Sequence, residues 1–289
     1  MGALAMGRVA VACTAVLLVL GAAACGERSE PTGESVGLYP VTVQAGDRPL
    51  VVTKPAQRIA VLDRSSEEIL RSLGAGPRIV VRPPQNRVNF TALRRARPDL
   101  IVASQDANER DLSRAASITH AGVYTASGDS IHQVEHVITQ LGLLTGTPVQ
   151  ARALVREIER QRREVDTRLA RVTRVAVFVD TGFLTTVSDQ SLIGDVIREA
   201  HGTNVGASLA DSGPIEIAQL ARLDPDVYLA TSDTDLTLQD LRSNPATQKL
   251  RAVREGRLVV ADAELLQPGP RIGEGLAQVA LLLHPDAFR

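Results

Sequence analysis

Short runs of β-branched and aliphatic residues alternate with segments of helical periodicity along the first half of this chain. The runs predict buried strands at 58–62, 77–81, 100–103 and from 122 onwards. The segments between them predict helices at 67–73, 89–96, 109–121 and 130–142, with Ser65 and Ser66 as candidate N-caps for the first of these. Strands that alternate with helices form a parallel sheet with helices on its faces. The first half therefore predicts an α/β domain.

A long, highly charged segment at 148–173 interrupts this alternation. Pro148 suits the first position of a helix. One narrow apolar stripe follows, made of Ala153, Leu154, Ile158, Val165 and Leu169. A helix of this length spans roughly 37 Å. It could run along two lobes, or lie on the surface of a single domain.

The second half repeats the plan of the first. It predicts strands at 175–179, 227–230 and 258–260, and helices at 192–200, 215–222 and 272–283. The segment 224–230 also echoes 97–103, since each has Pro-Asp before an apolar strand. We therefore expect an α/β fold of two Rossmann-like lobes with parallel sheets, at 55–147 and 174–289, joined by the one long α-helix at 148–173.

The N-terminus has the layout of an exported protein. Arg8 precedes an apolar stretch at 9–20, and the small residues 21–24 lead directly to Cys25. The stretch is short for a membrane-spanning helix, which needs about 20 residues. We predict a lipoprotein signal peptide at 1–24, lipidation of Cys25, and a lipidated tether at 25–54 that leads into the folded body. The alternative is an ordinary cleaved signal followed by an incidental cysteine.

Cysteine usage agrees with an anchor. The only other cysteine, Cys13, lies inside the predicted signal, so the mature chain would have one thiol and no internal disulfide. Residues 26–37 are rich in Gly, Ser, Pro and Glu and lack an apolar cluster. The expected location is the extracytoplasmic face of the cell membrane, reached through the lipid anchor alone.

Several classes of function lack support in the sequence. A net charge of −1 gives no basic surface for nucleic acid. No Gly-x-Ser-x-Gly motif or phosphate-binding glycine loop is present, and His132 and His136 lack the glutamate pattern of a metalloprotease. We therefore predict no catalytic residue, no metal site and no cofactor. The protein is not expected to be an enzyme.

Polar residues follow the predicted strands. In open α/β sheets, ligands bind beyond the carboxyl ends of the strands, and two facing lobes can bury a ligand between such loops. The alternative for each charged residue is a salt bridge at the rim or simple solvation. The predicted ligand-binding residues, which include Arg271 from a motif described next, are Asp63, Arg64, Arg82, Asp106, Asn108, Asp180, Thr181, Phe183, Asp233, Glu264 and Arg271.

The order of several motifs carries a resemblance to a known family. The motifs are Pro-Ala-Gln-Arg-Ile at 55–59, Arg-Pro-Asp-Leu-Ile at 97–101, Gly-Asp-Val-Ile-Arg-Glu-Ala at 194–200, Asp-Pro-Asp-Val at 224–227 and Gln-Pro-Gly-Pro-Arg at 267–271. Over 39–288 the chain resembles the substrate-binding proteins of ABC importers for cobalamin, ferric siderophores and haem. The resemblance implies a monomer that binds a corrinoid or ferric chelate between its lobes and passes it to an ABC permease.

Two departures from the family keep a second function open. Such proteins commonly carry a glutamate on a short helix of each lobe that docks onto permease arginines, and those positions are Thr91 and Ala218 here. Glu216 lies near the second position but is displaced in register. The loop at 82–88 is also shorter than in the family. The alternative is a binding or scaffold lipoprotein of the same fold that no longer serves transport.

Overall fold

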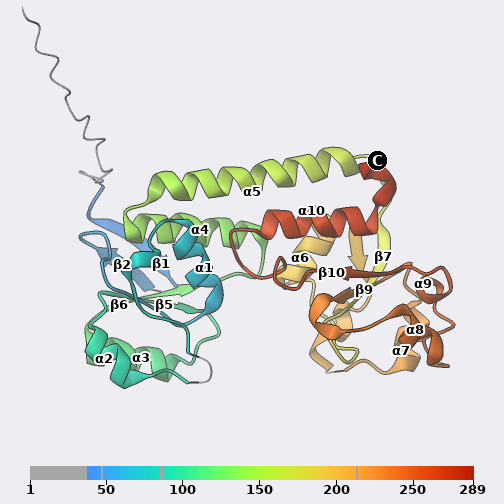
Figure 1. Cartoon of the computed structure of the whole chain (residues 1–289), viewed down its shortest axis with the longest axis horizontal. Coiled ribbons are helices and arrows are strands. Elements are labelled where there is room, and N and C mark those ends of the chain that lie inside the picture. Colours follow the sequence, from blue (N-terminus) through green and yellow to red (C-terminus); the bar gives the residue numbers. More distant parts are fainter. Residues whose placement is uncertain (1–37, 47, 85–86, 213) are drawn as a thin grey trace, which may run out of the picture. The chain divides into compact units, whose positions relative to one another are not determined.

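The first lobe is built on a four-stranded parallel sheet with the strand order β4-β3-β5-β6 (Figure 1). The computed structural model describes residues 38–46, 48–84, 87–212 and 214–289. Each strand of this sheet is followed by a helix. The elements of this lobe are β1 (Val41–Ala45), β2 (Arg48–Val52), β3 (Ile59–Val61), α1 (Arg64–Ser72), a 3-10 turn (Gly76–Arg78), β4 (Ile79–Val81), α2 (Phe90–Ala96), β5 (Leu100–Ser104), α3 (Glu109–Thr119), β6 (Gly122–Ala126) and α4 (Ile131–Thr145).

The second lobe repeats this architecture with the strand order β10-β9-β7-β8, again all parallel. The prediction of an α/β fold with parallel sheets in two lobes is confirmed. Three short elements of this lobe, β8, α8 and α9, were not predicted. Its elements are β7 (Val175–Asp180), α6 (Leu192–Glu199), β8 (Gly202–Asn204), α7 (Ile217–Leu223), β9 (Val227–Thr231), α8 (Leu238–Ser243), α9 (Arg251–Arg254), β10 (Leu258–Ala261), α10 (Ile272–Leu283) and 3-10 turns at Ala207–Ser212, Ser232–Thr234 and Pro285–Phe288.

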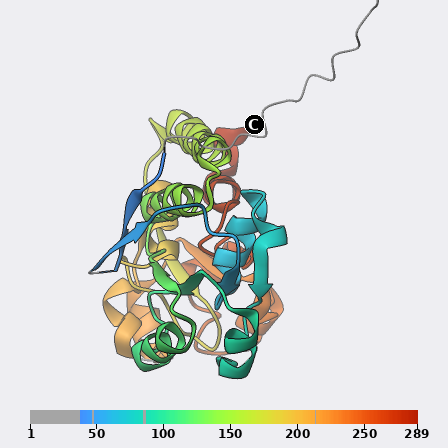
Figure 2. The ribbon, with the colours of Figure 1, turned by 90° about the vertical axis from the view of Figure 1, so that its left-hand side faces the viewer.

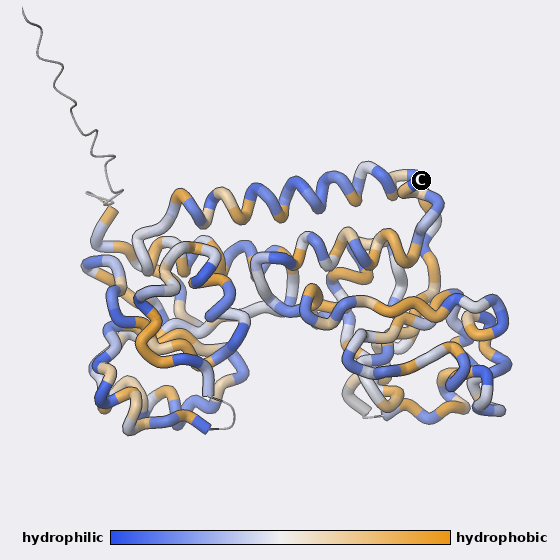
Figure 3. The backbone as a smooth tube through the Cα atoms, viewed as in Figure 1, coloured by the Kyte–Doolittle hydropathy of each residue, from blue (hydrophilic) through white to orange (hydrophobic). Residues whose placement is uncertain are grey.

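Helix α5 (Pro148–Leu169) packs against α4 of the first lobe and α10 of the second. Figure 3 shows it as a mostly hydrophilic rod with separate apolar positions. Its buried residues are Ala151, Ile158, Val165 and Leu169. The prediction of Ala153 in this stripe is wrong, because Ala153 is exposed and Ala151 faces the core. The helix also ends four residues before the predicted Thr173, where the chain turns toward β7.

An antiparallel hairpin of β1 and β2 precedes the first lobe and was not predicted. It lies within 25–54 and contacts α4 and β6 (Figure 2). Val43 points inward and is buried, whereas Thr42 and Gln44 on either side are exposed. The Tyr39 hydroxyl donates a hydrogen bond of 2.5 Å to the Leu143 carbonyl of α4. The segment before Pro55 is therefore part of the folded body from residue 38 onwards.

The start of α1 corrects another prediction. Asp63, and not Ser65 or Ser66, is the N-cap, because its backbone is extended and its side chain accepts a hydrogen bond from the Ser66 backbone N–H at 2.8 Å. The signal peptide, Cys25 and the tether at 26–37 lie outside the described residues. Among the helices that the structure does describe, none combines the length and apolar character needed to cross a membrane.

The apolar core runs through both lobes. One continuous cluster includes Tyr124 of β6, Ile138 of α4, Ile158 of α5 and Leu276 of α10. The sequence has no tryptophan, so aliphatic side chains supply most of this core. Burial of such side chains is the main driving force for folding. The core therefore holds α4, α5 and α10 together, and with them the two lobes.

Candidate functional site

A cavity of about 370 Å³ lies where three strands of the first sheet end. The loops that follow β3, β5 and β6 form most of its wall, and two residues before α10 complete it from the second lobe. Ligands of open α/β sheets bind at this kind of place. Its lining residues are Asp63, Arg64, Ser65, Ser66, Ile69, Ser104, Gln105, Asp106, Ala126, Ser127, Gly128, Asp129, Val134, Val137, Gln267 and Pro268.

Two polar atoms of this cavity are buried without a hydrogen-bond partner among the described residues. One is Oδ2 of Asp63 and the other is Oγ of Ser66, whose side chain is only 1% exposed. The other Asp63 oxygen caps α1. Burial raises the pKa of the Asp63 carboxyl, and the backbone N–H and the nearby side chain of Ser66 both oppose this rise. Buried polar atoms usually have partners, so these two unsatisfied atoms mark the cavity wall as a candidate site.

Hydrogen bonds hold the remaining polar wall in place. Gln105 donates to Asp129 at 2.7 Å, and the Ser104 hydroxyl donates to Asp106 at 3.4 Å. Gln133 of α4 accepts from the Ser127 hydroxyl at 2.9 Å. Three aspartates and one arginine line the cavity, and no aromatic residue does. The charged part of the cavity wall is therefore acidic on balance, and hydrogen bonds between its own side chains hold it in place.

The two lobes approach closely at this cavity. A Cβ atom on Gly128 would lie 2.6 Å from Cβ of Pro268, so only glycine fits there without movement of the proline. Beside this contact, Nε of Arg271 lies 3.3 Å from Oε1 of Glu68 in α1. The cavity therefore depends on both lobes for its walls.

The structure brings together three of the five residues predicted from the first lobe. Asp63, Arg64 and Asp106 line the cavity. Asn108 does not, because its side chain caps α3 by accepting from the backbone N–H groups of Arg110 and Asp111. Arg82 lines a different hollow beside α2.

The residues predicted from the second lobe do not line this cavity. Asp180 is buried and accepts a hydrogen bond of 2.6 Å from the Tyr228 hydroxyl. Thr181 closes a turn with Thr185, and Phe183 is 97% exposed with a left-handed φ of 53°. Asp233 and Glu264 are exposed, and Arg271 bridges Glu68 and Glu264.

Several lining residues were not among the predicted site residues. Ser127, Gly128 and Asp129 follow β6, whose carboxyl end the sequence pattern did not define. Ser66 was considered only as a cap. Gln267 and Pro268 belong to the motif at 267–271, of which only Arg271 was predicted as a site residue. One of the motifs that carried the family resemblance thus contained the two lining residues of the second lobe.

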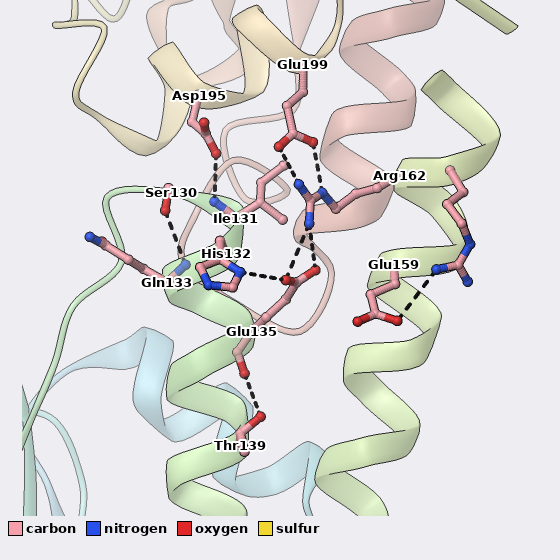
Figure 4. A network of polar contacts seen from close by, with 11 residues as sticks. Ser130, Ile131, His132, Gln133, Glu135, Thr139, Glu159, Arg162, Asp195 and Glu199 are labelled. Atoms are coloured by element: carbon pink, nitrogen blue, oxygen red, sulfur yellow. Dashed lines mark hydrogen bonds and ion pairs between the residues drawn. The ribbon is translucent and has the colours of Figure 1, made fainter. Parts of the chain in front are cut away.

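A network of charges links the lobes behind the cavity. Arg162 of α5 donates to Glu199 of α6 at 2.7 Å and to Glu135 of α4 at 3.1 Å, as Figure 4 shows. Asp195 of α6 accepts from the Ile131 backbone N–H at 2.9 Å. Helix α4 begins at Ile131, directly after the β6 loop of the cavity. The network therefore fixes how that loop is held against the second lobe.

The histidines of α4 do not form a metal centre with their neighbours. Nδ1 of His132 lies 3.5 Å from Oε2 of Glu135, and His136 is exposed. Within the ranges that the structure describes, no group of three or more His, Cys, Asp or Glu side chains is placed to hold a metal ion.

Comparison with known families identifies the fold and its general role. The family model described as periplasmic binding protein matches residues 77–265. This chain belongs to that family. The prediction from the order of its motifs is confirmed: the chain is a periplasmic binding protein of the ABC transporter type, a family of substrate-binding proteins.

Full-length relatives and solved structures agree with this assignment. An uncharacterized ABC transporter substrate-binding lipoprotein, YvrC, of Bacillus subtilis is 20% identical over 92% of this chain and 94% of its own length. The iron-uptake system-binding protein of the same organism is 22% identical over 91% and 94%. The structure of CeuE from Helicobacter pylori in complex with Ni-His has a TM-score of 0.73 at 16% identity and covers 86% of this chain and 89% of its own.

Proposed function

We propose that this protein is an extracytoplasmic solute-binding lipoprotein that captures a compact, polar metal chelate in the 370 Å³ cavity. The observation that carries the proposal is a pair of buried atoms, Asp63 Oδ2 and Ser66 Oγ, that have no hydrogen-bond partner among the described residues and belong to a cavity walled by both lobes. A ligand that donates hydrogen bonds to these atoms removes the cost of leaving them unsatisfied. Capture needs no covalent step.

The size and chemistry of the cavity favour a small chelate over haem or a corrinoid. Ligand sites commonly enclose 300–1,000 Å³, so 370 Å³ lies near the low end of this range. No aromatic residue is present in the wall to stack on a macrocycle. Three aspartates against one arginine favour a neutral or positively charged ligand with several donors. An iron-uptake protein and a protein in complex with Ni-His are among those similar to this chain.

Lipidation of Cys25 would hold the protein beside the membrane. The sequence pattern at 1–25 supports this anchor, and a similar protein is named a lipoprotein. The tether at 26–37 would let the folded body reach a permease while staying attached. Closure around the ligand is expected to be small, because α5 packs on both α4 and α10.

A second function, binding or scaffolding without transport, is favoured by one observation. Thr91 of α2 and Ala218 of α7 are both exposed, so neither docking position of the family resemblance carries a charge. Exposed charges on partner surfaces accelerate association. A permease that accepts this chain would therefore rely on other residues.

The direct test is thermal denaturation of the purified chain with a ligand panel of a neutral iron(III) tris-hydroxamate, an iron(III) tris-hydroxamate with a pendant ammonium group, nickel(II)-histidine, haem and cobalamin. A ligand at a hundred times its Kd stabilises the folded state by about 2.7 kcal/mol. We expect a rise in Tm with at least one of the three small chelates. No rise with any member of the panel would contradict solute capture, and a rise with haem or cobalamin alone would contradict the proposed ligand class.

A further inference from the structure

A second hollow, of about 820 Å³, lies beside α2 and the edge strand β4. It shares no lining residue with the cavity at the strand ends, and the second lobe contributes nothing to it. Val80 and Val81 of β4 and Ala92, Leu93 and Ala96 of α2 form its apolar base. The hollow is therefore a separate feature of the first lobe.

Four arginines line this hollow, and no acidic residue does. They are Arg58, which precedes β3, Arg82, which follows β4, Arg87 and Arg95 of α2. The surrounding sequence is equally one-sided, because residues 82–97 contain five arginines and no Asp or Glu. Like charges gathered in one hollow repel one another. This arrangement therefore favours a bound group of opposite charge.

Another arginine-lined hollow of this protein has carboxylates in its wall. A hollow of about 550 Å³ beside α5 is also lined by four arginines, but Glu159, Asp166 and Glu199 line it too. Arg162 there pairs with Glu199 at 2.7 Å. The hollow beside α2 differs in having no such compensation from its own walls.

The guanidinium groups of this hollow differ in how they are held. Arg58 is fixed by donating to the Ala96 carbonyl, with Nε at 2.9 Å and Nη2 at 2.5 Å. Arg82 reaches Glu67 only at 3.8 Å and its side chain is 72% exposed. Among the described residues, Arg87 and Arg95 form no hydrogen bond or ion pair through their side chains. The guanidinium groups of Arg82, Arg87 and Arg95 are thus available to a bound anion, whereas that of Arg58 is held by the Ala96 carbonyl.

We infer that this hollow binds a phosphate-bearing anion with at least two negative charges. The planar fork of arginine matches phosphate oxygens in a bidentate manner, and several forks around one group favour a multiply charged anion. The volume leaves room for more than one phosphate or for an attached organic group. Such a group can come from a free polyphosphate or organic phosphate, or from the headgroup of a phospholipid.

Isothermal titration of the full purified chain at low ionic strength tests this site. Inorganic pyrophosphate serves as the probe for a free phosphate, and phosphatidylcholine vesicles that contain phosphatidic acid serve as the probe for a headgroup. We expect one or both to bind, and the tighter of the two indicates the source. The double variant Arg87→Gln/Arg95→Gln should weaken binding by about a hundredfold, or about tenfold for each lost charge-assisted contact. Added salt should weaken binding further.

Two controls keep the result specific. Arg152→Gln removes an exposed arginine of α5 that lies outside the hollow and should leave binding unchanged. Asp106→Asn alters the chelate cavity and should also leave binding of the phosphate probes unchanged. A failure of this inference can therefore be told apart from a failure of the proposed function. Absence of binding by both probes would overturn the inference. Equal binding by the double variant, with an unchanged Tm in the absence of probe, would overturn it as well.

Discussion

Asp63 has two structural tasks at the residue scale. Its Oδ1 atom caps α1, while its Oδ2 atom is buried beside the cavity with no partner among the described residues. The first task fixes the side chain, so the second oxygen is held in position before a ligand arrives. Preorganised groups lose less entropy on binding. The cost of this arrangement is the burial of a carboxylate, which raises its pKa.

Replacement of this carboxylate gives a pH-dependent prediction. Asn is an equally good N-cap, so Asp63→Asn should keep α1 intact. Since the folded-state pKa of Asp63 lies above the unfolded value of 3.8, the wild type loses stability as the pH rises from that value through the folded pKa. The free energy of unfolding of the variant, measured by urea denaturation, should therefore increase relative to that of the wild type between about pH 3.5 and about pH 7. Asp233→Asn is the control at an exposed site, and a difference that does not change with pH would contradict the prediction.

The buried pair of Tyr228 and Asp180 gives a second residue-scale prediction. The Tyr228 hydroxyl donates to Oδ2 of Asp180 at 2.6 Å, and both side chains are buried. Tyr228→Phe removes this donor and should lower the free energy of unfolding by about 1–3 kcal/mol. Tyr124→Phe is the matched control, because the Tyr124 hydroxyl makes no hydrogen bond within the described ranges. Equal losses from the two variants would show that the Asp180 contact is not the cause.

Helix α5 matters at the scale of elements because it touches both lobes. Arg162 lies near its middle and joins α4 to α6 through Glu135 and Glu199, whose side chains are 8% and 23% exposed. These carboxylates and the hydrogen bonds that they accept raise the pKa of Arg162, so it stays charged. The helix thus contributes a charged link in addition to its apolar stripe.

Removal of this link should destabilise the protein. Arg162→Met leaves two partly buried carboxylates without their cation, and we expect a loss of about 1–3 kcal/mol in urea denaturation, less than for a fully buried pair. Arg160→Met on the same helix breaks only exposed pairs with Glu157 and Glu164 and should cost at most about 0.5 kcal/mol. Similar losses from both variants would mean that the link contributes no more than a surface pair.

The sequence predicts the elements better than it predicts the site. Alternation of strands and helices defines both sheets and α5, because buried parallel strands are continuous apolar runs. The hairpin is harder to predict, since Pro49 within β2 argues against a strand and the edge position that tolerates it is not visible in sequence. The contact of Gly128 with Pro268 joins residues 140 positions apart. Only the packed lobes create it, so the second wall of the cavity escaped prediction.

The whole molecule is proposed to work at a membrane surface. Thioether lipidation needs the thiol of Cys25, so Cys25→Ser should move the protein from the membrane fraction to the soluble fraction of a bacterial host. It should also abolish incorporation of labelled palmitate. Cys13→Ser lies within the predicted signal peptide and is the matched control. Retention of Cys25→Ser in the membrane with the label present would contradict the anchor.

The central claim is that a small metal chelate occupies the cavity between the strand ends and Pro268. Calorimetric titration with nickel(II)-histidine and with a neutral iron(III) tris-hydroxamate tests it on three forms of the chain. Wild type and Asp233→Asn should bind at least one chelate alike, since Asp233 is exposed and lies outside the cavity. Asp106→Asn, which changes the wall, should bind it about tenfold more weakly. Equal affinity in all three forms, or no binding by the wild type, would contradict the claim.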